Sequence, residues 1–193
     1  ITNDDHIRDA LITSGFSDTQ AKLFTDSWSV VGHQYNTPSG FSATLFQSKE
    51  TGEQVYATRG TEPSDPLSDL FYADLGGIVI NGLAVDQIVD MYNDWQRLNA
   101  PKDVAYDIKV LKFEPLLTLT LGGFDLTGLL SSGSVVYEQA SGAIFSIQES
   151  RSDIEYGADD PRAVGAGEVA SSNVTTTGHS LGGHLAFSFS RLF

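Results

Sequence analysis

Towards its end the sequence reads Asn173-Val174-Thr175-Thr176-Thr177 and then Gly178-His179-Ser180-Leu181-Gly182. The first half is a short β-branched run typical of a strand, and residues 181–193 carry apolar side chains at helical spacing. We therefore expect a strand, a sharp turn and a helix in direct succession. A serine on such a turn is held in a sparsely allowed backbone conformation, and the segments before and after it pass close together. Glycine at positions 178 and 182 permits this approach because glycine has no side chain.

Residues 178–182 match the pattern G-x-S-x-G, which is typical of the nucleophile elbow of α/β-hydrolases. In such a turn Ser180 projects its hydroxyl above the sheet edge, and the backbone N–H of Leu181 points at the oxyanion that develops during acyl transfer. His179, at the variable position, is expected to pack beside the elbow. The alternative is a Ser/Gly turn without chemistry. The strand before the pattern and the small residues after it favour the elbow.

A longer stretch, Gly178-His179-Ser180-Leu181-Gly182-Gly183-His184-Leu185-Ala186, resembles the elbow of the class 3 lipase family, in particular of extracellular bacterial lipases and phospholipases. Upstream, Tyr56-Ala57-Thr58-Arg59-Gly60-Thr61 followed by Asp69-Leu70 resembles the strand, the Arg-Gly-Ser/Thr turn and the acidic helix start of the same family. The two motifs stand in the family's order, and the resemblance runs from about residue 40 to the last residue.

The resemblance implies an α/β fold with an α/β-hydrolase-like sheet, of which this chain would form the N-terminal part. It implies a carboxylic ester hydrolase, either a triacylglycerol lipase or a phospholipase, with Ser180 as nucleophile. The backbone N–H groups of Thr61 and Leu181 would form the oxyanion hole. The expected partners are a lipid or acyl-ester substrate and a lipid interface, and the expected location is extracellular. No cofactor is assigned, since calcium is possible but no motif supports it.

The acid and the base of a catalytic triad are missing from the expected positions. In α/β-hydrolases the chain order is Ser, then Asp or Glu, then His, but only 13 residues follow Ser180. His184 lies one helical turn further on and is not expected to reach back over Ser180. His6 and His33 precede the sheet, where a surface or helix-end position is the ordinary one. We therefore expect an N-terminal fragment whose partner is the C-terminal remainder of the same enzyme, with the elbow strand as a sheet edge.

Two other functional classes stay open. The chain could be a catalytically silent module that keeps an apolar cleft and binds lipid or acyl ligands. Peptidase or thioesterase chemistry on the same fold is a weaker third hypothesis.

Composition and charge narrow the range of partners. The 193 residues, 40% of them hydrophobic, predict one globular domain over residues 1–193, although an incomplete one. The net charge of −14 does not fit nucleic acid, which needs clustered Lys and Arg. An anionic membrane would repel such a chain, whereas neutral or zwitterionic lipid would not. The absence of cysteine excludes disulfides, thiol catalysis and Cys-ligated zinc.

Three further sequence features bear on metals and membranes. Asp65, Asp69 and Asp74 could donate to calcium, but scattered acids in an acidic chain are usually solvated, so no metal is assigned. Residues 110–130 are apolar but contain charges and a proline, which makes them a poor membrane span. No charged and then apolar leader opens the chain, so we expect that any signal was removed or was never N-terminal.

The apolar periodicity also predicts the remaining elements. N-terminal helices occupy residues 1–36, with two helical patterns between residues 4 and 33, and residues 82–99 form a further helix. The expected strands are residues 41–47 paired with 54–59, then 105–113, and a second hairpin of 135–138 with 143–147. Residues 113–172 form an insertion or covering region. Within it, residues 116–130 are either a lipid-contacting flap or a core segment, and residues 153–172 form a loop. Residues 62–75 are either a lid or an ordinary N-capped helix.

Overall fold

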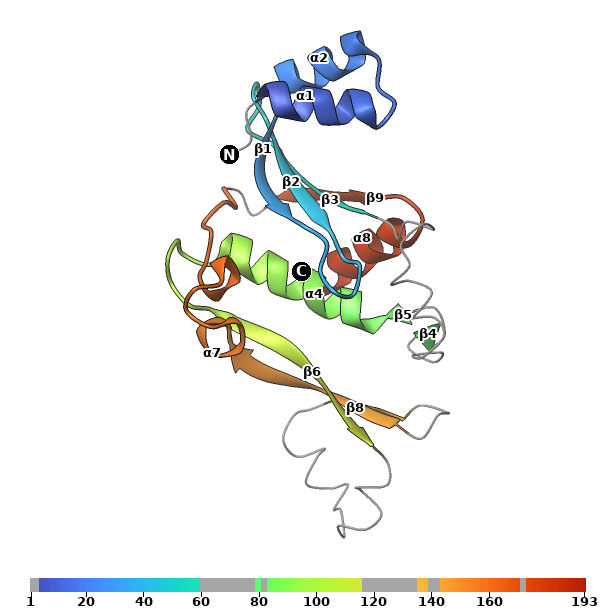
Figure 1. Ribbon diagram of the computed structural model, residues 1–193, viewed down its shortest axis with the longest axis vertical. Helices are drawn as coiled ribbons and strands as arrows, with labels where there is room; N and C mark the ends of the chain where they lie inside the picture. Colours follow the sequence, from blue (N-terminus) through green and yellow to red (C-terminus); the bar gives the residue numbers. More distant parts are fainter. Residues whose placement is uncertain (1–3, 60–78, 81–82, 116–134, 139–142, 171–172) are drawn as a thin grey trace. The chain divides into compact units, whose positions relative to one another are not determined.

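The computed structural model describes residues 4–59, 79–80, 83–115, 135–138, 143–170 and 173–193 (Figure 1). Over these residues the protein belongs to the α/β class, with helices and a mixed sheet. The chain divides into two compact units, of which unit 1 comprises Ile1–Thr61 and Gly167–Phe193 and unit 2 comprises Glu62–Ala166. Each unit has a sheet of its own.

Unit 1 contains a four-stranded sheet with the order β1-β2-β3-β9. Its strands are β1 (Trp28–Gln34), β2 (Ala43–Ser48), β3 (Gln54–Thr58) and β9 (Val174–Gly178). β2 is antiparallel to both β1 and β3, and β3 is parallel to β9. Strands β1, β3 and β9 therefore run in one direction, and their C-terminal ends lie at the same edge of the sheet.

One face of this sheet packs on helix α8 (Leu181–Leu192), which follows β9 directly (Figure 1). The helix buries Leu185, Ala186 and Phe189, and the Phe189 ring lies 5.2 Å from the ring of the fully buried Tyr56. Tyr56 stands beside Leu45 in the register of β2 and β3, so both belong to this covered face. The core of unit 1 therefore lies between α8 and the sheet.

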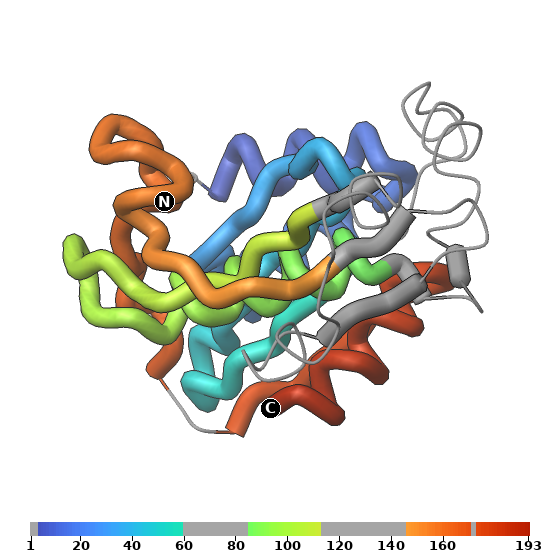
Figure 2. Tube along the Cα trace, turned by 90° about the horizontal axis from the view of Figure 1, so that it is seen from below, coloured from blue at the N-terminus to red at the C-terminus, as the bar shows by residue number. Residues whose placement is uncertain are grey.

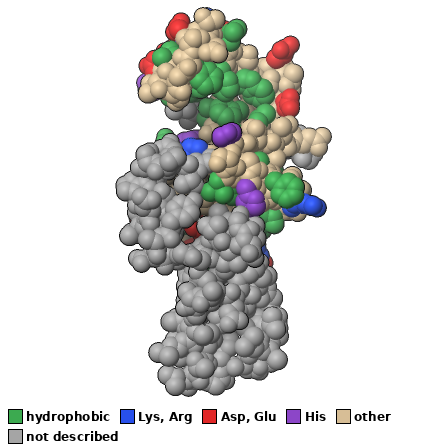
Figure 3. All heavy atoms as spheres, turned by 90° about the vertical axis from the view of Figure 1, so that its right-hand side faces the viewer, with side chains coloured by type: hydrophobic (Ala, Val, Ile, Leu, Met, Phe, Trp, Pro, Cys, Tyr) green, Lys and Arg blue, Asp and Glu red, His purple; other side chains and the backbone are tan. Residues whose placement is uncertain are grey.

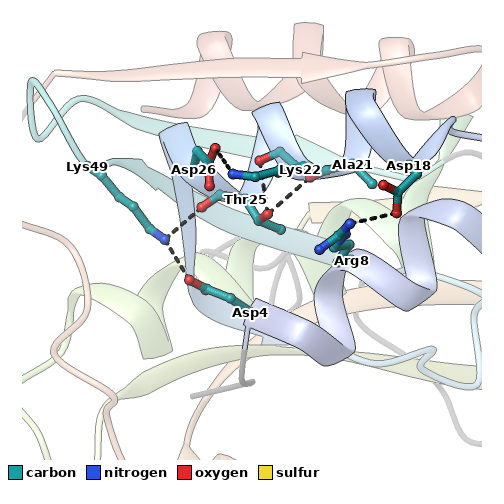
Figure 4. Close-up of polar contacts among 8 residues, drawn as sticks. All are labelled: Asp4, Arg8, Asp18, Ala21, Lys22, Thr25, Asp26 and Lys49. Carbon is teal, nitrogen blue, oxygen red and sulfur yellow. Dashed lines mark hydrogen bonds and ion pairs between the residues drawn. The ribbon is translucent and has the colours of Figure 1, made fainter.

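Helices α1 (Asp4–Thr13) and α2 (Asp18–Ser27) precede the sheet. A capping box between Ser17 and Gln20 starts α2, and the Phe24 ring meets Phe46 of β2 edge to face at 5.4 Å. Figure 4 shows how Lys49 ties the helices to the β2–β3 turn, since its ammonium group donates to the Thr25 carbonyl at 2.7 Å and pairs with Asp4 at 2.8 Å. Acidic and hydrophobic side chains both reach the surface of this helical pair, at the top of Figure 3.

The prediction of helix up to residue 33 is wrong. Helix α2 ends at Ser27, and Trp28–Gln34 form a strand. The physical reason is the run Trp28-Ser29-Val30-Val31, because aromatic and β-branched side chains favour a strand once a partner offers backbone hydrogen bonds. β2 supplies that partner in an antiparallel register from Trp28 opposite Ser48 to Gln34 opposite Ala43.

Unit 2 is built on helix α4 (Val85–Asn99), which Figure 2 shows in green, and a three-stranded antiparallel sheet with the order β6-β8-β7. The strands are β6 (Asp107–Pro115), β7 (Val135–Glu138) and β8 (Ala143–Arg151), and a two-stranded pair, β4 (Val79–Ile80) and β5 (Leu83–Ala84), precedes α4. The Asn93 amide joins α4 to β6 because it donates to the Lys109 carbonyl at 2.7 Å and accepts from the Lys109 N–H at 2.8 Å. The apolar side of α4 is buried, including Val89, Met91 and Leu98.

A buried hydroxyl connects the loops of unit 2. Ser152, at the start of α7 (Ser152–Tyr156), is fully buried; its Oγ accepts from the Tyr106 N–H at 2.9 Å and donates to the Ala163 carbonyl at 2.7 Å. The Tyr106 hydroxyl donates in turn to the carbonyl of Arg162 in the short helix η1 (Pro161–Ala163). Burial chiefly raises the pKa of Tyr106, which keeps its hydroxyl protonated as a donor.

Most of the remaining elements confirm the sequence predictions. The two hairpins, the helix before residue 99, the strand after residue 105, the elbow strand and the last helix are present, with ends shifted by a few residues. The loop expected over residues 153–172 is partly wrong, because α7 and η1 lie within it. Residues 62–75 and 116–130, together with Asp65, Asp69 and Asp74, lie outside the described residues.

Replacement of Ser152 by alanine tests the buried connection in unit 2. Ser152→Ala removes one acceptor and one donor and leaves the Tyr106 N–H and the Ala163 carbonyl unpaired, so we expect the free energy of unfolding to fall by about 1–3 kcal/mol. Urea denaturation followed by circular dichroism measures this change. The control is Ser190→Ala on the exposed side of α8, which should cost much less. Equal losses in both variants would contradict a special role for Ser152.

Candidate functional site

The turn between β9 and α8 holds Ser180 in a strained conformation. Ser180 has φ 56° and ψ −126°, and among the described residues only Asp103 is a second non-glycine residue with positive φ. Such a conformation costs about 1–3 kcal/mol and persists only where the surroundings impose it. The strained serine that the G-x-S-x-G pattern predicts is therefore present between a strand and a helix, and its side chain is exposed.

Two glycines make the turn sterically feasible. A Cβ atom on Gly178 would overlap with the carbonyl of Gly182 and would lie 2.7 Å from Thr58 Oγ1. A Cβ on Gly183 would lie 3.3 Å from the Gly178 carbonyl oxygen, which is tight but not prohibitive. The close approach of strand and helix that the sequence predicts for positions 178 and 182 is thus observed, and position 178 admits no side chain without displacement of its neighbours.

Thr58 fixes the turn from the neighbouring strand, a role that the sequence reasoning did not assign. Its buried hydroxyl contacts two carbonyl oxygens, Gly182 O at 2.7 Å and Thr177 O at 3.2 Å. The single hydroxyl proton of Thr58 is thereby shared between a carbonyl near the end of β9 and a carbonyl in the first turn of α8. The signal was present in the sequence, because Thr58 lies inside the upstream motif that resembles the lipase strand.

A backbone N–H donor, that of Leu181, lies next to the exposed and strained Ser180. Leu181 is the first residue of α8, so its N–H has no carbonyl within the helix to which it could donate. The next N–H groups are used, since Gly182 donates to the His179 carbonyl at 2.9 Å and Gly183 to the Ser180 carbonyl at 3.0 Å. The positive end of the α8 dipole adds to the Leu181 donor at this point. An anionic oxygen beside Ser180 would be stabilised there.

The end of β3 lies beside the elbow. Thr58 is the register partner of Gly178 in the parallel pair β3–β9, so the chain after Thr58 leaves the sheet next to the turn that carries Ser180. Arg59 is the last described residue of that segment. Thr61, the expected second oxyanion donor, lies outside the described residues, and its role stays a prediction.

No hydrogen bond joins a histidine side chain to the Ser180 side chain among the described residues. His6 is exposed on α1, and His179 is exposed in the turn itself. His33 is in the same cross-sheet row as Thr177, but three strands away, which is about 14 Å at the usual strand spacing. His184 donates its backbone N–H to the Ser180 carbonyl, and its buried Nε2 has no hydrogen-bond partner within the described part of the chain.

The described part of the chain shows neither a metal cluster nor a membrane-spanning helix. No group of three or more His, Cys, Asp or Glu side chains placed to hold a metal ion occurs in the described ranges. None of the described helices is both long enough and apolar enough to cross a bilayer.

The described groups with clearly raised pKa values belong mainly to unit 2, where burial is the leading cause for Asp86, Tyr106 and Tyr156.

Replacement of Gly178 by alanine tests the close approach in the turn. Because the new methyl group would overlap with Gly182, we expect Gly178→Ala to lower the free energy of unfolding by about 1–3 kcal/mol. Gly183→Ala is the matched control, since its methyl group meets only a 3.3 Å contact and alanine favours a helix. Thermal denaturation of both variants measures the difference. A Gly178→Ala variant as stable as Gly183→Ala would contradict the observed packing.

The chain has no match among family models, curated proteins or solved structures. The resemblance to class 3 lipases therefore rests on the two motifs alone. We infer the chemistry of this site from the geometry of β3, β9 and α8.

Proposed function

We propose that this chain carries the nucleophile of a serine ester hydrolase that acts on lipid acyl esters, on an α/β-hydrolase-like sheet. The observation that carries the proposal is the positive φ of Ser180 in a turn from a parallel strand into a helix, with Gly178 against Gly182. A strained, exposed serine at the N-terminus of a helix is the arrangement of the nucleophile in the elbow of α/β-hydrolases. The two motifs that resemble the class 3 lipases give the same assignment.

The reaction proceeds in two steps. Ser180 Oγ attacks the ester carbonyl carbon, its proton passes to a base, and the carbonyl oxygen becomes an oxyanion that accepts hydrogen bonds from the N–H groups of Leu181 and Thr61. The carbon–oxygen bond to the alcohol then breaks, the alcohol leaves with a proton, and an acyl-Ser180 ester remains. Water hydrolyses that ester and releases the fatty acid. In this proposal the C-terminal remainder of the enzyme supplies the acid and the base.

The lipid class of substrate is supported by the resemblance, and the net charge is compatible with neutral or zwitterionic lipids. A net charge of −14 repels anionic lipid surfaces but not neutral or zwitterionic ones. An extracellular location belongs to the same proposal, because the motifs resemble those of secreted bacterial lipases and phospholipases.

A catalytically silent binding module is the second candidate. It is favoured by one observation, namely that no described histidine or carboxylate side chain is hydrogen-bonded to Ser180. The two candidates differ in the reactivity of the Ser180 hydroxyl, since a silent module would keep the turn but not an activated nucleophile.

Covalent labelling tests the nucleophile. We expect a long-chain alkyl phosphonate ester to modify the full-length protein at Ser180, and we expect Ser180→Ala to abolish both labelling and ester hydrolysis. Mass spectrometry of the labelled peptides identifies the modified residue. Ser190→Ala, which removes an exposed hydroxyl from the last turn of the same helix, is the control and should be labelled normally. An adduct on another residue would remove Ser180 from its role, and no labelling at all would favour the silent module.

Removal of the second backbone donor tests the oxyanion hole. Thr61→Pro eliminates one N–H group, so we expect the turnover of a p-nitrophenyl ester to fall by about 10²-fold or more. Circular dichroism has to show unchanged folding, because proline also restricts the backbone. Unaltered turnover in a folded Thr61→Pro variant would exclude Thr61 from the site.

A further inference from the structure

A pocket of about 570 Å³ opens on unit 1 beside the end of β3. Its floor is the sheet face opposite α8, formed by His33, Thr44 and Ala57, which stand in one row across β1, β2 and β3. Its rim includes Asn36, just after β1, and Arg59, just after β3. The pocket is therefore at the edge where the parallel strands end, and ligands of open α/β sheets bind outside that edge.

The lining of this pocket, which we call the Arg59 pocket, differs in charge from the rest of the chain. The whole sequence has 25 acidic and 11 basic residues, yet the described residues that line the pocket include an arginine and a histidine and, among them, neither Asp nor Glu. A guanidinium group has five N–H donors in a planar fork, which suits an anion with several oxygens. The pocket thus offers a site for a carboxylate or a phosphate.

The walls are held in place by short hydrogen bonds. Arg59 donates its backbone N–H to the Ser42 carbonyl at 2.9 Å, and Ser42 Oγ donates to the Gln34 carbonyl at 2.8 Å. The Arg59 guanidinium donates to Asn36 Oδ1, so the segments after β1 and after β3 are joined across the rim. A site whose donors are fixed in advance loses little entropy when a ligand binds.

The pocket is one strand away from the elbow. Ala57 on its floor is the register partner of Thr177, and Thr58 is the partner of Gly178, two residues before Ser180. Adjacent strands are about 5 Å apart. Arg59 and Ser180 therefore follow the ends of adjacent strands, and a phospholipid presents its phosphate and its sn-2 acyl ester on neighbouring carbons of glycerol.

We propose that the Arg59 pocket binds the phosphodiester of a glycerophospholipid headgroup, and that Arg59 directs the Ser180 site to phospholipids rather than to neutral glycerides. This inference rests on the proposed function. A neutral glyceride presents no charge to the guanidinium and gains nothing from it, whereas a phosphodiester accepts charge-assisted hydrogen bonds. The acidic chain does not repel a zwitterionic phospholipid, because that headgroup has no net charge.

Binding to a protein that cannot turn over is the direct test. Isothermal titration calorimetry of the Ser180→Ala protein uses monomeric 1,2-dihexanoyl-sn-glycero-3-phosphocholine, 1,2-dihexanoylglycerol and inorganic phosphate as separate ligands. We expect the added change Arg59→Gln to raise the Kd of the phospholipid by about tenfold or more and to leave that of dihexanoylglycerol unchanged. Arg191→Gln, which removes an equal charge from the far end of α8, is the matched control and should change neither value.

A second variant leaves the arginine in place. Asn36→Leu removes the acceptor that positions the guanidinium, so we expect it to raise the Kd of the phospholipid in the same direction but less, and circular dichroism checks the folding of each variant. The inference is overturned if Arg59→Gln and Asn36→Leu bind the phospholipid as the parent does, or if dihexanoylglycerol shows the same dependence on Arg59. It is also overturned if inorganic phosphate binds and the phospholipid does not, because the pocket would then be a simple anion site.

The outcomes separate this inference from the proposed function. Phosphonate labelling of Ser180 without Arg59-dependent phospholipid binding would keep the hydrolase and overturn the headgroup site. Arg59-dependent binding without labelling of Ser180 would keep the headgroup site and overturn the hydrolase.

Discussion

The hydroxyl of Thr58 donates to the carbonyl of Gly182, and this one bond joins β3 to the first turn of α8. Around it, Gly178 presses against Gly182 and Ser180 takes its positive φ. Strain of this kind persists only when neighbouring contacts impose it. The exposed position of Ser180, the donor at Leu181 and the placement of the segment after β3 all depend on that contact, because it sets where strand and helix stand relative to each other.

The charge of the protein is distributed unevenly with respect to this edge of the sheet. The helical pair α1–α2 carries acidic side chains, some of them in exposed ion pairs such as Arg8 with Asp18 and Lys22 with Asp26. Exposed pairs of this kind contribute little to stability. Among the described residues that line the Arg59 pocket, Arg59 is charged and no carboxylate occurs, so the charge of these residues is opposite in sign to the net charge of the chain. The net charge of a protein influences its approach to a charged surface, whereas the charge of individual side chains decides which chemical group can be held beside Ser180.

The sequence alone predicts those helices, strands and turns that are determined by neighbouring residues, through apolar spacing or through the residues of a turn. The pattern around Ser180 predicted a strained turn with two close glycines, and helix α4 and both hairpins followed from apolar spacing. Prediction from the sequence failed at Trp28–Gln34, where pairing with β2 decides between helix and strand. It also failed at Ser152–Tyr156, where a helix forms in a segment with the composition of a loop. Thr58 was overlooked for a similar reason, since its hydroxyl acts on a residue that is distant in sequence. Thr61 lies outside the described residues.

The parallel pairing of β3 with β9 has a consequence for how the protein folds. Thr58 and Gly182 are 124 positions apart in the chain, and the whole of unit 2 lies between them. Contacts of such long range form slowly, because the entropy of closing a large loop has to be lost before any hydrogen bond rewards it. The hairpin of β2 and β3 needs no such closure. We therefore expect Ser180 to acquire its conformation late in folding, after the hairpin of β2 and β3 has formed.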